Sequence, residues 1–151
     1  MFRTILVLGA LTTPAFLSAQ QTALVGSWKI SYPGGVRMEN GEQTVLWATG
    51  TLTVDRQGDS LIANLVRDPG PEPPRAPMRL AGAASVDPAV FEYRSQVTVN
   101  VNGEASFVPA ISLWSLRAVG DSLTGSIERR VEGPYPQRME PQPVSGKRVG
   151  G

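Results

Sequence analysis

Two stretches decide the fold of this chain: residues 54–65, VDRQGDSLIANL, and residues 116–127, LRAVGDSLTGSI. They lie 62 residues apart, and both contain the tetrapeptide GDSL. In each copy apolar residues alternate with polar ones before GDSL and again after it, as expected for two strands joined by a tight turn. The pattern predicts that Gly58 and Gly120 bend the chain with a positive φ. It also predicts that Leu61 and Leu123 start the returning strands and face inward.

The letters GDSL also name a family of serine esterases, in which Ser60 or Ser122 would be the nucleophile. Serine hydrolysis requires a base beside the hydroxyl, and that family supplies a histidine. This chain has no histidine. A serine–lysine pair would need Lys29 or Lys147, the only lysines, to be buried and neutral, and nothing in the spacing requires that. We therefore expect two hairpin bends, no catalytic residues and no enzymatic activity.

Strand patterns continue along the chain, whereas helical periodicity is almost absent. The turn signals Asn40-Gly41 and Asn102-Gly103 support two further hairpins. The sequence predicts one all-β antiparallel up-and-down meander, closed into a barrel, with a two-sheet sandwich as the alternative. Eight strands are expected, at residues 24–31, 43–55, 60–67, 78–84, 90–101, 104–117, 122–131 and 144–149.

Two proline-rich segments interrupt this pattern. Residues 67–77 hold five prolines and residues 133–143 hold four. Proline has no backbone N–H to donate, so neither segment is expected to join the interior of a sheet. Two interpretations remain open: stiff surface connections, or a lid or docking edge made of preordered extended chain.

The first 19 residues have the features of a secretory signal peptide. Arg3 is their only charge, an apolar run extends from Ile5 to Leu11, and small residues end at Ala19. The run is too short for a membrane span. No cysteine is present for a lipid anchor or a disulfide. We expect a bacterial periplasmic or secreted protein that comprises one domain, residues 20–151, and no membrane span after cleavage.

Charge and composition argue against several kinds of partner. Without Arg3, 13 basic and 13 acidic side chains remain, so the net charge is zero. Nucleic-acid-binding domains usually carry an excess of basic residues, so we do not expect this protein to bind nucleic acid. With no histidine or cysteine, and acids spaced singly along the chain, we expect neither a metal site nor a cofactor.

The ends of the barrel domain carry a family resemblance. Gly26-Ser27-Trp28 forms a G-x-W on the first expected strand, and Arg148 lies on the last. This pairing resembles the calycins, which include lipocalins, fatty-acid-binding proteins and avidins. The resemblance implies that Arg148 stacks across the Trp28 indole and that Gly26 leaves room for the backbone, together closing one end of the barrel. The T-D-Y motif and the helix usual in lipocalins are missing, and biotin binding is not implied.

Two functions from different classes follow. The first is binding of a small apolar or amphipathic ligand inside the barrel, by Trp28, Trp47, Phe91, Tyr93, Phe107 and Trp114. The second is a structural or accessory subunit that docks onto a cell-envelope protein complex through a sheet edge or a proline-rich loop. An internal cavity distinguishes them, because a filled core would leave the first function without a site.

Overall fold

A computed structural model describes residues 23–39, 42–84, 86–133 and 136–150. The expected signal peptide, residues 1–19, and the Asn40-Gly41 turn lie outside these described residues. The strands are β1 (Gly26–Glu39), β2 (Glu42–Gln57), β3 (Ser60–Arg67), β4 (Met78–Ala83), β5 (Ala89–Val101), β6 (Glu104–Val119), β7 (Ser122–Val131), β8 (Gln137–Arg138) and β9 (Gln142–Arg148).

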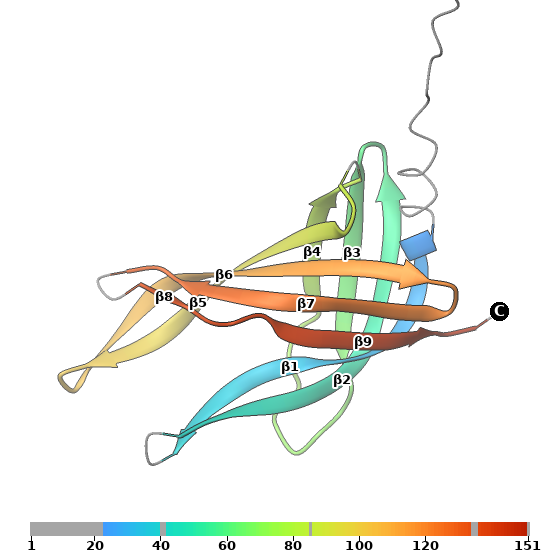
Figure 1. Ribbon diagram of the computed structural model, residues 1–151. Coiled ribbons are helices and arrows are strands. Elements are labelled where there is room, and N and C mark those ends of the chain that lie inside the picture. The colour runs from blue at the N-terminus through green and yellow to red at the C-terminus, as the bar shows by residue number, and fades with distance from the viewer. Residues whose placement is uncertain (1–22, 40–41, 85, 134–135, 151) are drawn as a thin grey trace, which may run out of the picture.

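Eight of these strands form a closed antiparallel barrel, which confirms the predicted fold class (Figure 1). Each strand pairs with the next along the chain from β1 to β7, and β7 pairs with β9. The circle closes where β9 pairs with β1, with Trp28 opposite Arg148 and Ser31 opposite Ser145. Closure removes the two exposed sheet edges that an open meander would leave.

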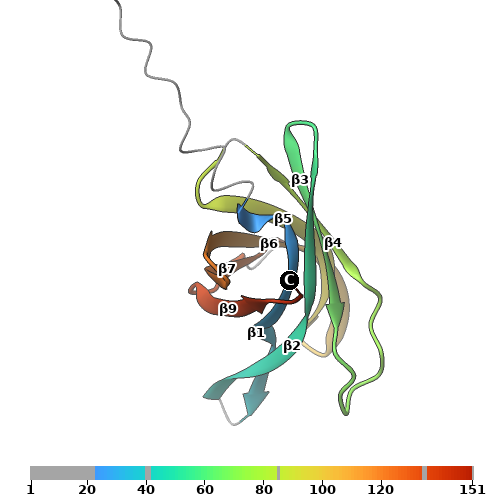
Figure 2. The same cartoon turned by 90° about the vertical axis from the view of Figure 1, so that its right-hand side faces the viewer.

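The connections alternate between the two ends of the barrel, and the ends differ. The β2–β3 and β6–β7 turns lie at one end, beside the start of β1, which we call the closed end. At the open end, the β1–β2 and β5–β6 hairpins project beyond the barrel (Figures 1 and 2). Both proline-rich segments, which link β3 to β4 and β7 to β9, also lie at the open end.

The turn chemistry agrees with the sequence pattern. Gly58 and Gly120 have φ of 60° and 58°, so both GDSL segments are bends with a left-handed glycine. Leu61 and Leu123 follow these bends and are buried. Asn102 and Gly103 have φ of 53° and 82°, as in the tight turn that suits two twisted strands.

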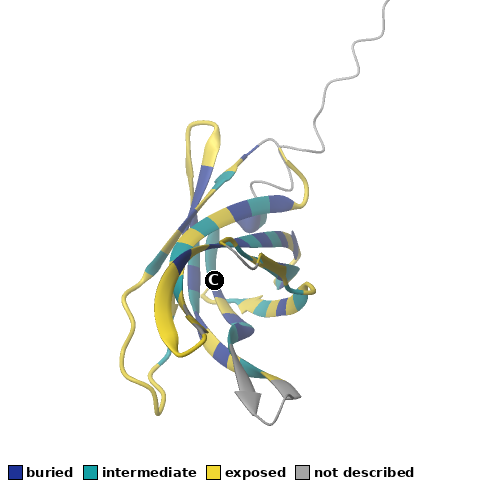
Figure 3. Ribbon diagram, turned by 90° about the vertical axis from the view of Figure 1, so that its left-hand side faces the viewer, coloured by how far each residue is buried: buried dark blue, intermediate teal, exposed yellow. Residues whose placement is uncertain are grey.

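Alternate residues of every long strand face a single core, visible as alternating bands of burial in Figure 3. The sequence period of two therefore becomes an inner apolar face and an outer polar face. The large side chains with almost no exposed surface are Trp28, Trp114, Phe91, Ile30, Leu52, Leu61, Leu65, Leu80, Leu116, Leu123, Ile127 and Val54.

Most strand boundaries differ from the prediction by one or two residues, and larger differences occur at β1 and in the segment 133–143. The first strand begins at Gly26, because Ala23 and Leu24 form a helical turn ahead of it, and it continues to Glu39 past a bulge between Pro33 and Gly35. The bulge allows the strand to continue through a Pro-Gly-Gly sequence that would otherwise be expected to end it. The segment 133–143 is also not purely a loop: β8 pairs with the end of β7. Its pairing is limited to two residues at the sheet edge, in keeping with the flanking prolines.

The bend interpretation of GDSL predicts which residues of the motif matter for stability. Replacing Ser60 and Ser122 together by alanine is expected to change the free energy of unfolding by less than about 1 kcal/mol, since surface changes are small. Gly58→Val or Gly120→Val is expected to cost about 1 kcal/mol or more, because a branched side chain resists positive φ. Denaturant unfolding measures all three variants. Ester hydrolysis that disappears in the double serine variant would contradict the interpretation.

Candidate functional site

The closed end is sealed by Trp28 and Arg148. The Trp28 side chain has 0% exposure, and its indole N–H donates to the Leu24 carbonyl at 2.9 Å. The Arg148 Cζ lies 4.1 Å from the Trp28 ring centroid. The guanidinium donates to the carbonyls of Val25 (3.1 Å) and Ala23 (2.7 Å). Arg148 thus covers the indole and ties the chain entering β1 to the last strand.

Gly26 is required where this chain passes under Arg148. Its φ is 131°, and a Cβ built there would lie 2.7 Å from Arg148 Nη1. A side chain at this position would push the guanidinium off the Trp28 ring. The three residues that the calycin resemblance singles out therefore lie together as a plug at this end of the barrel.

A cavity of about 510 Å³ occupies the open end of the barrel. Inward-facing residues of six strands line it, together with residues of both proline-rich segments. The lining residues are Tyr32, Gly34, Leu65, Arg67, Arg75, Ala76, Met78, Tyr93, Ser95, Gln96, Val97, Ala110, Ser112, Trp114, Arg129, Val131 and Met139. Tyr32, Leu65 and Trp114 also belong to the buried core, so they separate the cavity from the closed end.

Aromatic side chains form much of the cavity wall. The rings of Tyr32 and Trp114 lie 5.5 Å apart at a tilt of 46°. Burial raises the pKa of the Tyr32 hydroxyl above its usual value, so it stays protonated at neutral pH. The Trp114 indole N–H is buried and has no hydrogen-bond partner within the described part of the chain. This part of the wall offers a flat aromatic surface.

Three arginines, Arg67, Arg75 and Arg129, also line the cavity. The two-residue alternation of the strands explains why two of these arginines point inward. Arg67 follows Leu61, Ala63 and Leu65 on the inner face of β3, and Arg129 follows Leu123, Gly125 and Ile127 on the inner face of β7. Their inner faces thus change from apolar in the core to cationic in the cavity.

Arg129 is half-buried in the cavity wall. Its Nη2 donates to the Pro33 carbonyl at 2.7 Å, and within the described chain no carboxylate pairs with it. Burial lowers the pKa of the Arg129 guanidinium, and the positive charge of Arg75 lowers it further against the opposing effect of Tyr32. The guanidinium remains charged at neutral pH, because arginine starts from so high a value.

One acid stands at the cavity mouth. Glu72, in the first proline-rich segment, forms an ion pair with Arg67 at 3.1 Å and accepts a hydrogen bond from Arg75 at 3.2 Å, both through the same oxygen. Glu72 itself is not a lining residue, and none of the described lining residues is Asp or Glu. The charge of the cavity wall is therefore positive.

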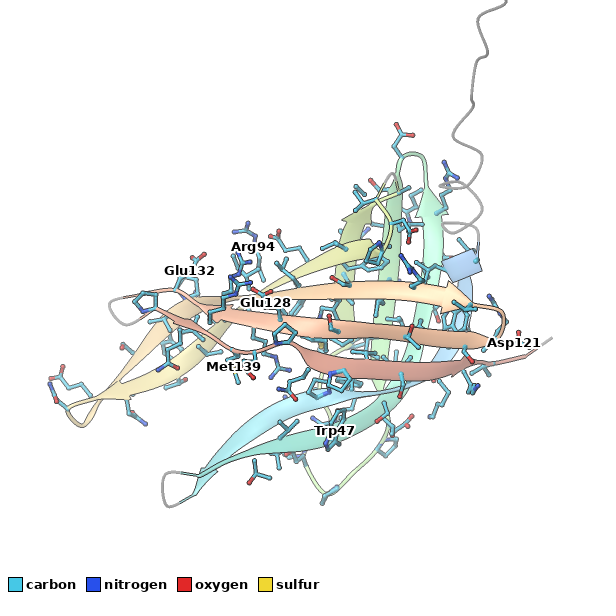
Figure 4. The ribbon with its side chains drawn as sticks, in the orientation of Figure 1. Trp47, Arg94, Asp121, Glu128, Glu132 and Met139 are labelled. Carbon is cyan, nitrogen blue, oxygen red and sulfur yellow. The ribbon has the colours of Figure 1, made fainter. Side chains whose placement is uncertain are left out.

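Other acids nearby already have partners on the outer surface. Hydrogen bonds from Lys29 and Thr49 lower the pKa of the Asp68 carboxyl. Hydrogen bonds from Arg130 and Arg138 likewise lower the pKa of Glu128, which is labelled in Figure 4. Both carboxylates are therefore already hydrogen-bonded to side chains outside the cavity.

The six aromatic residues expected to bind a ligand do not form one site. Tyr93 and Trp114 line the cavity, whereas Trp28 and Phe91 are fully buried in the core and do not reach it. Trp47 and Phe107 are 53% and 75% exposed. They lie on the outer faces of the two projecting hairpins, as Figure 4 shows for Trp47.

The placement of Trp47 and Phe107 corrects the expectation that they face the interior. Trp47 lies an odd number of residues from the inward-facing Leu52, and Phe107 lies an odd number from Trp114, so strand alternation turns both outward. This signal was present in the sequence. The expected set missed Tyr32 and the three arginines. Tyr32 is in phase with Trp28, but it lies beyond the predicted end of its strand.

A serine–lysine contact occurs at the closed end, where β7 begins. Lys147 Nζ donates to Ser122 Oγ at 2.7 Å, a pairing not expected from the spacing. This contact is exposed to solvent, whereas serine–lysine catalysis relies on a lysine shielded from water.

No group of three potential metal ligands occurs in the described segments. Within the same segments, no helix has the length and apolarity needed to cross a membrane.

The chain was compared with models of known protein families, with characterised proteins and with solved structures, and none of them matches it.

Proposed function

We propose that this protein is an exported, non-enzymatic β-barrel that binds a small apolar or amphipathic molecule in its open-end cavity. The observation that carries the proposal is the cavity itself: about 510 Å³, with Tyr32, Tyr93 and Trp114 in its wall. Cavities that bind small molecules typically measure about 300–1,000 Å³ and combine apolar walls with a few polar groups. The export signal, bacterial periplasmic or secreted location and distant kinship with calycins belong to the same proposal.

The division of the barrel into two halves supports this function. A barrel of eight strands is just wide enough to be filled by its own side chains. Here large side chains fill the closed half, whereas the inner positions of β6 in the open half carry the small residues Ala110 and Ser112. The small side chains leave space that a ligand is able to occupy.

A cavity-filling substitution tests the proposal. Ala110→Phe places a ring in the cavity and is expected to weaken binding of the fluorescent apolar probe N-phenylnaphthylamine by about tenfold or more. Ala105→Phe is the matched control: the same change in the same strand, at an exposed position outside the cavity, leaves binding unchanged. Fluorescence titration gives both affinities. No binding to the unmodified protein, or equal binding to both variants, would contradict the proposal.

The exposed aromatic residues favour a second candidate function. Phe107 and Trp47 present large apolar side chains on hairpins that extend beyond the barrel. Such exposed aromatics are typical of contact surfaces between proteins. They suit an accessory subunit that docks onto a cell-envelope complex. Native mass spectrometry of the protein from its own host distinguishes the two functions, since it shows either a retained small molecule or a partner chain.

A further inference from the structure

Among the residues that the structure describes, the cavity carries more positive charge than its acids neutralise. Arg67, Arg75 and Arg129 line it, and Glu72, at its mouth, is shared between the first two. The hydrogen bond of Arg129 goes to the Pro33 carbonyl, which carries no formal charge. Removing a charge from water is costly unless an opposite charge compensates it, so a half-buried arginine without a carboxylate favours an anion close by.

The cavity wall presents arginines beside aromatic rings. We propose that the ligand of this cavity is an amphipathic organic anion, whose carboxylate, sulfate or phosphate group binds Arg129 together with Arg75 or Arg67. Its apolar body lies against Tyr32, Tyr93 and Trp114. This inference rests on the proposed ligand-binding function and specifies the chemistry of the ligand.

The donors available in the cavity suit this chemistry. Guanidinium groups bind planar oxyanions through paired hydrogen bonds, and these are stronger than hydrogen bonds between neutral groups. Tyr32 is held protonated by burial, so its hydroxyl can also donate. Tyr32 lines the same cavity as Arg67, Arg75 and Arg129. The positive charges of these arginines lower the pKa of Tyr32, whereas burial, the largest effect, and the negative charge of Asp68 raise it.

Glu72 is the cavity's own counterion. It forms ion pairs with Arg67, at the end of β3, and with Arg75, in the proline-rich segment; the pair with Arg75 is exposed and the pair with Arg67 is partly exposed. Exposed ion pairs contribute little to stability, so a ligand anion is able to replace Glu72 on one or both arginines at small cost. The first proline-rich segment then functions as part of the binding site.

A matched pair of probes tests the inference on the purified protein. Anilinonaphthalene sulfonate and N-phenylnaphthylamine share an aromatic body and differ in the sulfonate. We expect the anionic probe to bind about tenfold more tightly than the neutral one, since charge-assisted hydrogen bonds are worth more than apolar contact alone. Arg129→Gln is expected to remove this preference and to leave the neutral probe within about twofold. Arg79→Gln, which neutralises an exposed arginine on the outer face of β4, is the control and leaves both affinities unchanged.

Glu72→Gln provides a second variant with an effect of opposite sign. The residue lies in a surface segment, so its replacement does not threaten folding. Freed from their counterion, Arg67 and Arg75 are expected to bind the anionic probe about two- to fivefold more tightly. Circular dichroism confirms that each variant is folded before titration.

The outcomes separate this inference from the proposed function. If the neutral probe binds as tightly as the anionic one, or if Arg129→Gln weakens both probes equally, the anionic chemistry is wrong and ligand binding stands. A Glu72→Gln variant that binds the anion less tightly would also overturn it. If neither probe binds the unmodified protein, both the inference and the proposed function fail.

Discussion

Replacing Trp28 by alanine is expected to lower the free energy of unfolding by about 3–5 kcal/mol, the usual cost of deleting a large buried aromatic side chain. The indole is fully buried, donates to the Leu24 carbonyl and forms the surface on which Arg148 stacks. Its loss removes all three contacts and leaves Arg148 without the ring beneath it. Because small domains are stabilised by only about 5–15 kcal/mol, the variant is expected to be partly unfolded under mild conditions.

Trp47→Ala is the matched control for this effect. Trp47 is 53% exposed on the outside of the β1–β2 hairpin, and its loss is expected to cost less than about 1 kcal/mol. Urea unfolding followed by circular dichroism compares the two variants without relying on tryptophan fluorescence. Equal costs for Trp28→Ala and Trp47→Ala would contradict the burial of Trp28 at the closed end, because the buried side chain loses far more apolar contact.

The topology of this protein was predictable from its sequence because local signals agreed with one another. Period-two patterns marked all eight barrel strands, and glycine-containing turns placed hairpins between them. The bounds of β3 and β7 match the prediction, because each begins at a GDSL bend. The G-x-W segment and Arg148 indicated where the barrel closes, since the two must be neighbours when the first and last strands pair.

The cavity was less predictable, because it depends on where each strand crosses from the packed core into the open end. The sequence shows that Arg67 and Arg129 share the inward phase of their strands. It does not show that the ends of β3 and β7 meet across the barrel. That proximity depends on strand tilt and stagger, which are set by all the pairings around the circle. Arg75 reaches the cavity from a proline-rich loop. A loop has no regular alternation of side chains, so the sequence does not show which way Arg75 points.

The bulge in β1 shows a similar limit. Pro33, Gly34 and Gly35 resemble a turn in sequence, yet the strand continues through them to Glu39. Because the prediction ended this strand early, Tyr32 was left at its margin, although it is a buried residue of the cavity wall. A Pro-Gly-Gly segment has the conformational freedom for either outcome, and the long pairing with β2 stabilises the extended one.

Gly125→Ala is expected to cost about 2–3 kcal/mol or more, although it adds a single methyl group. Gly125 lies inside β7 opposite Leu116, and a Cβ there would overlap the Ser115 carbonyl oxygen and press on the Leu116 side chain. The oxygen belongs to the backbone of the neighbouring strand, so relief requires β6 and β7 to separate, and their pairing is one link in the closed circle of strands.

Gly70→Ala is the control for Gly125→Ala, and its effect is expected to have the opposite sign. Gly70 lies in the first proline-rich segment, where a Cβ would meet open space and φ is not positive. Alanine there restricts the unfolded chain and is expected to stabilise the protein by about 0.4–1 kcal/mol. Thermal unfolding measures both changes. A neutral effect of Gly125→Ala would contradict the close approach of β6 and β7 at this position, because the two strands would have to lie farther apart than the structure places them.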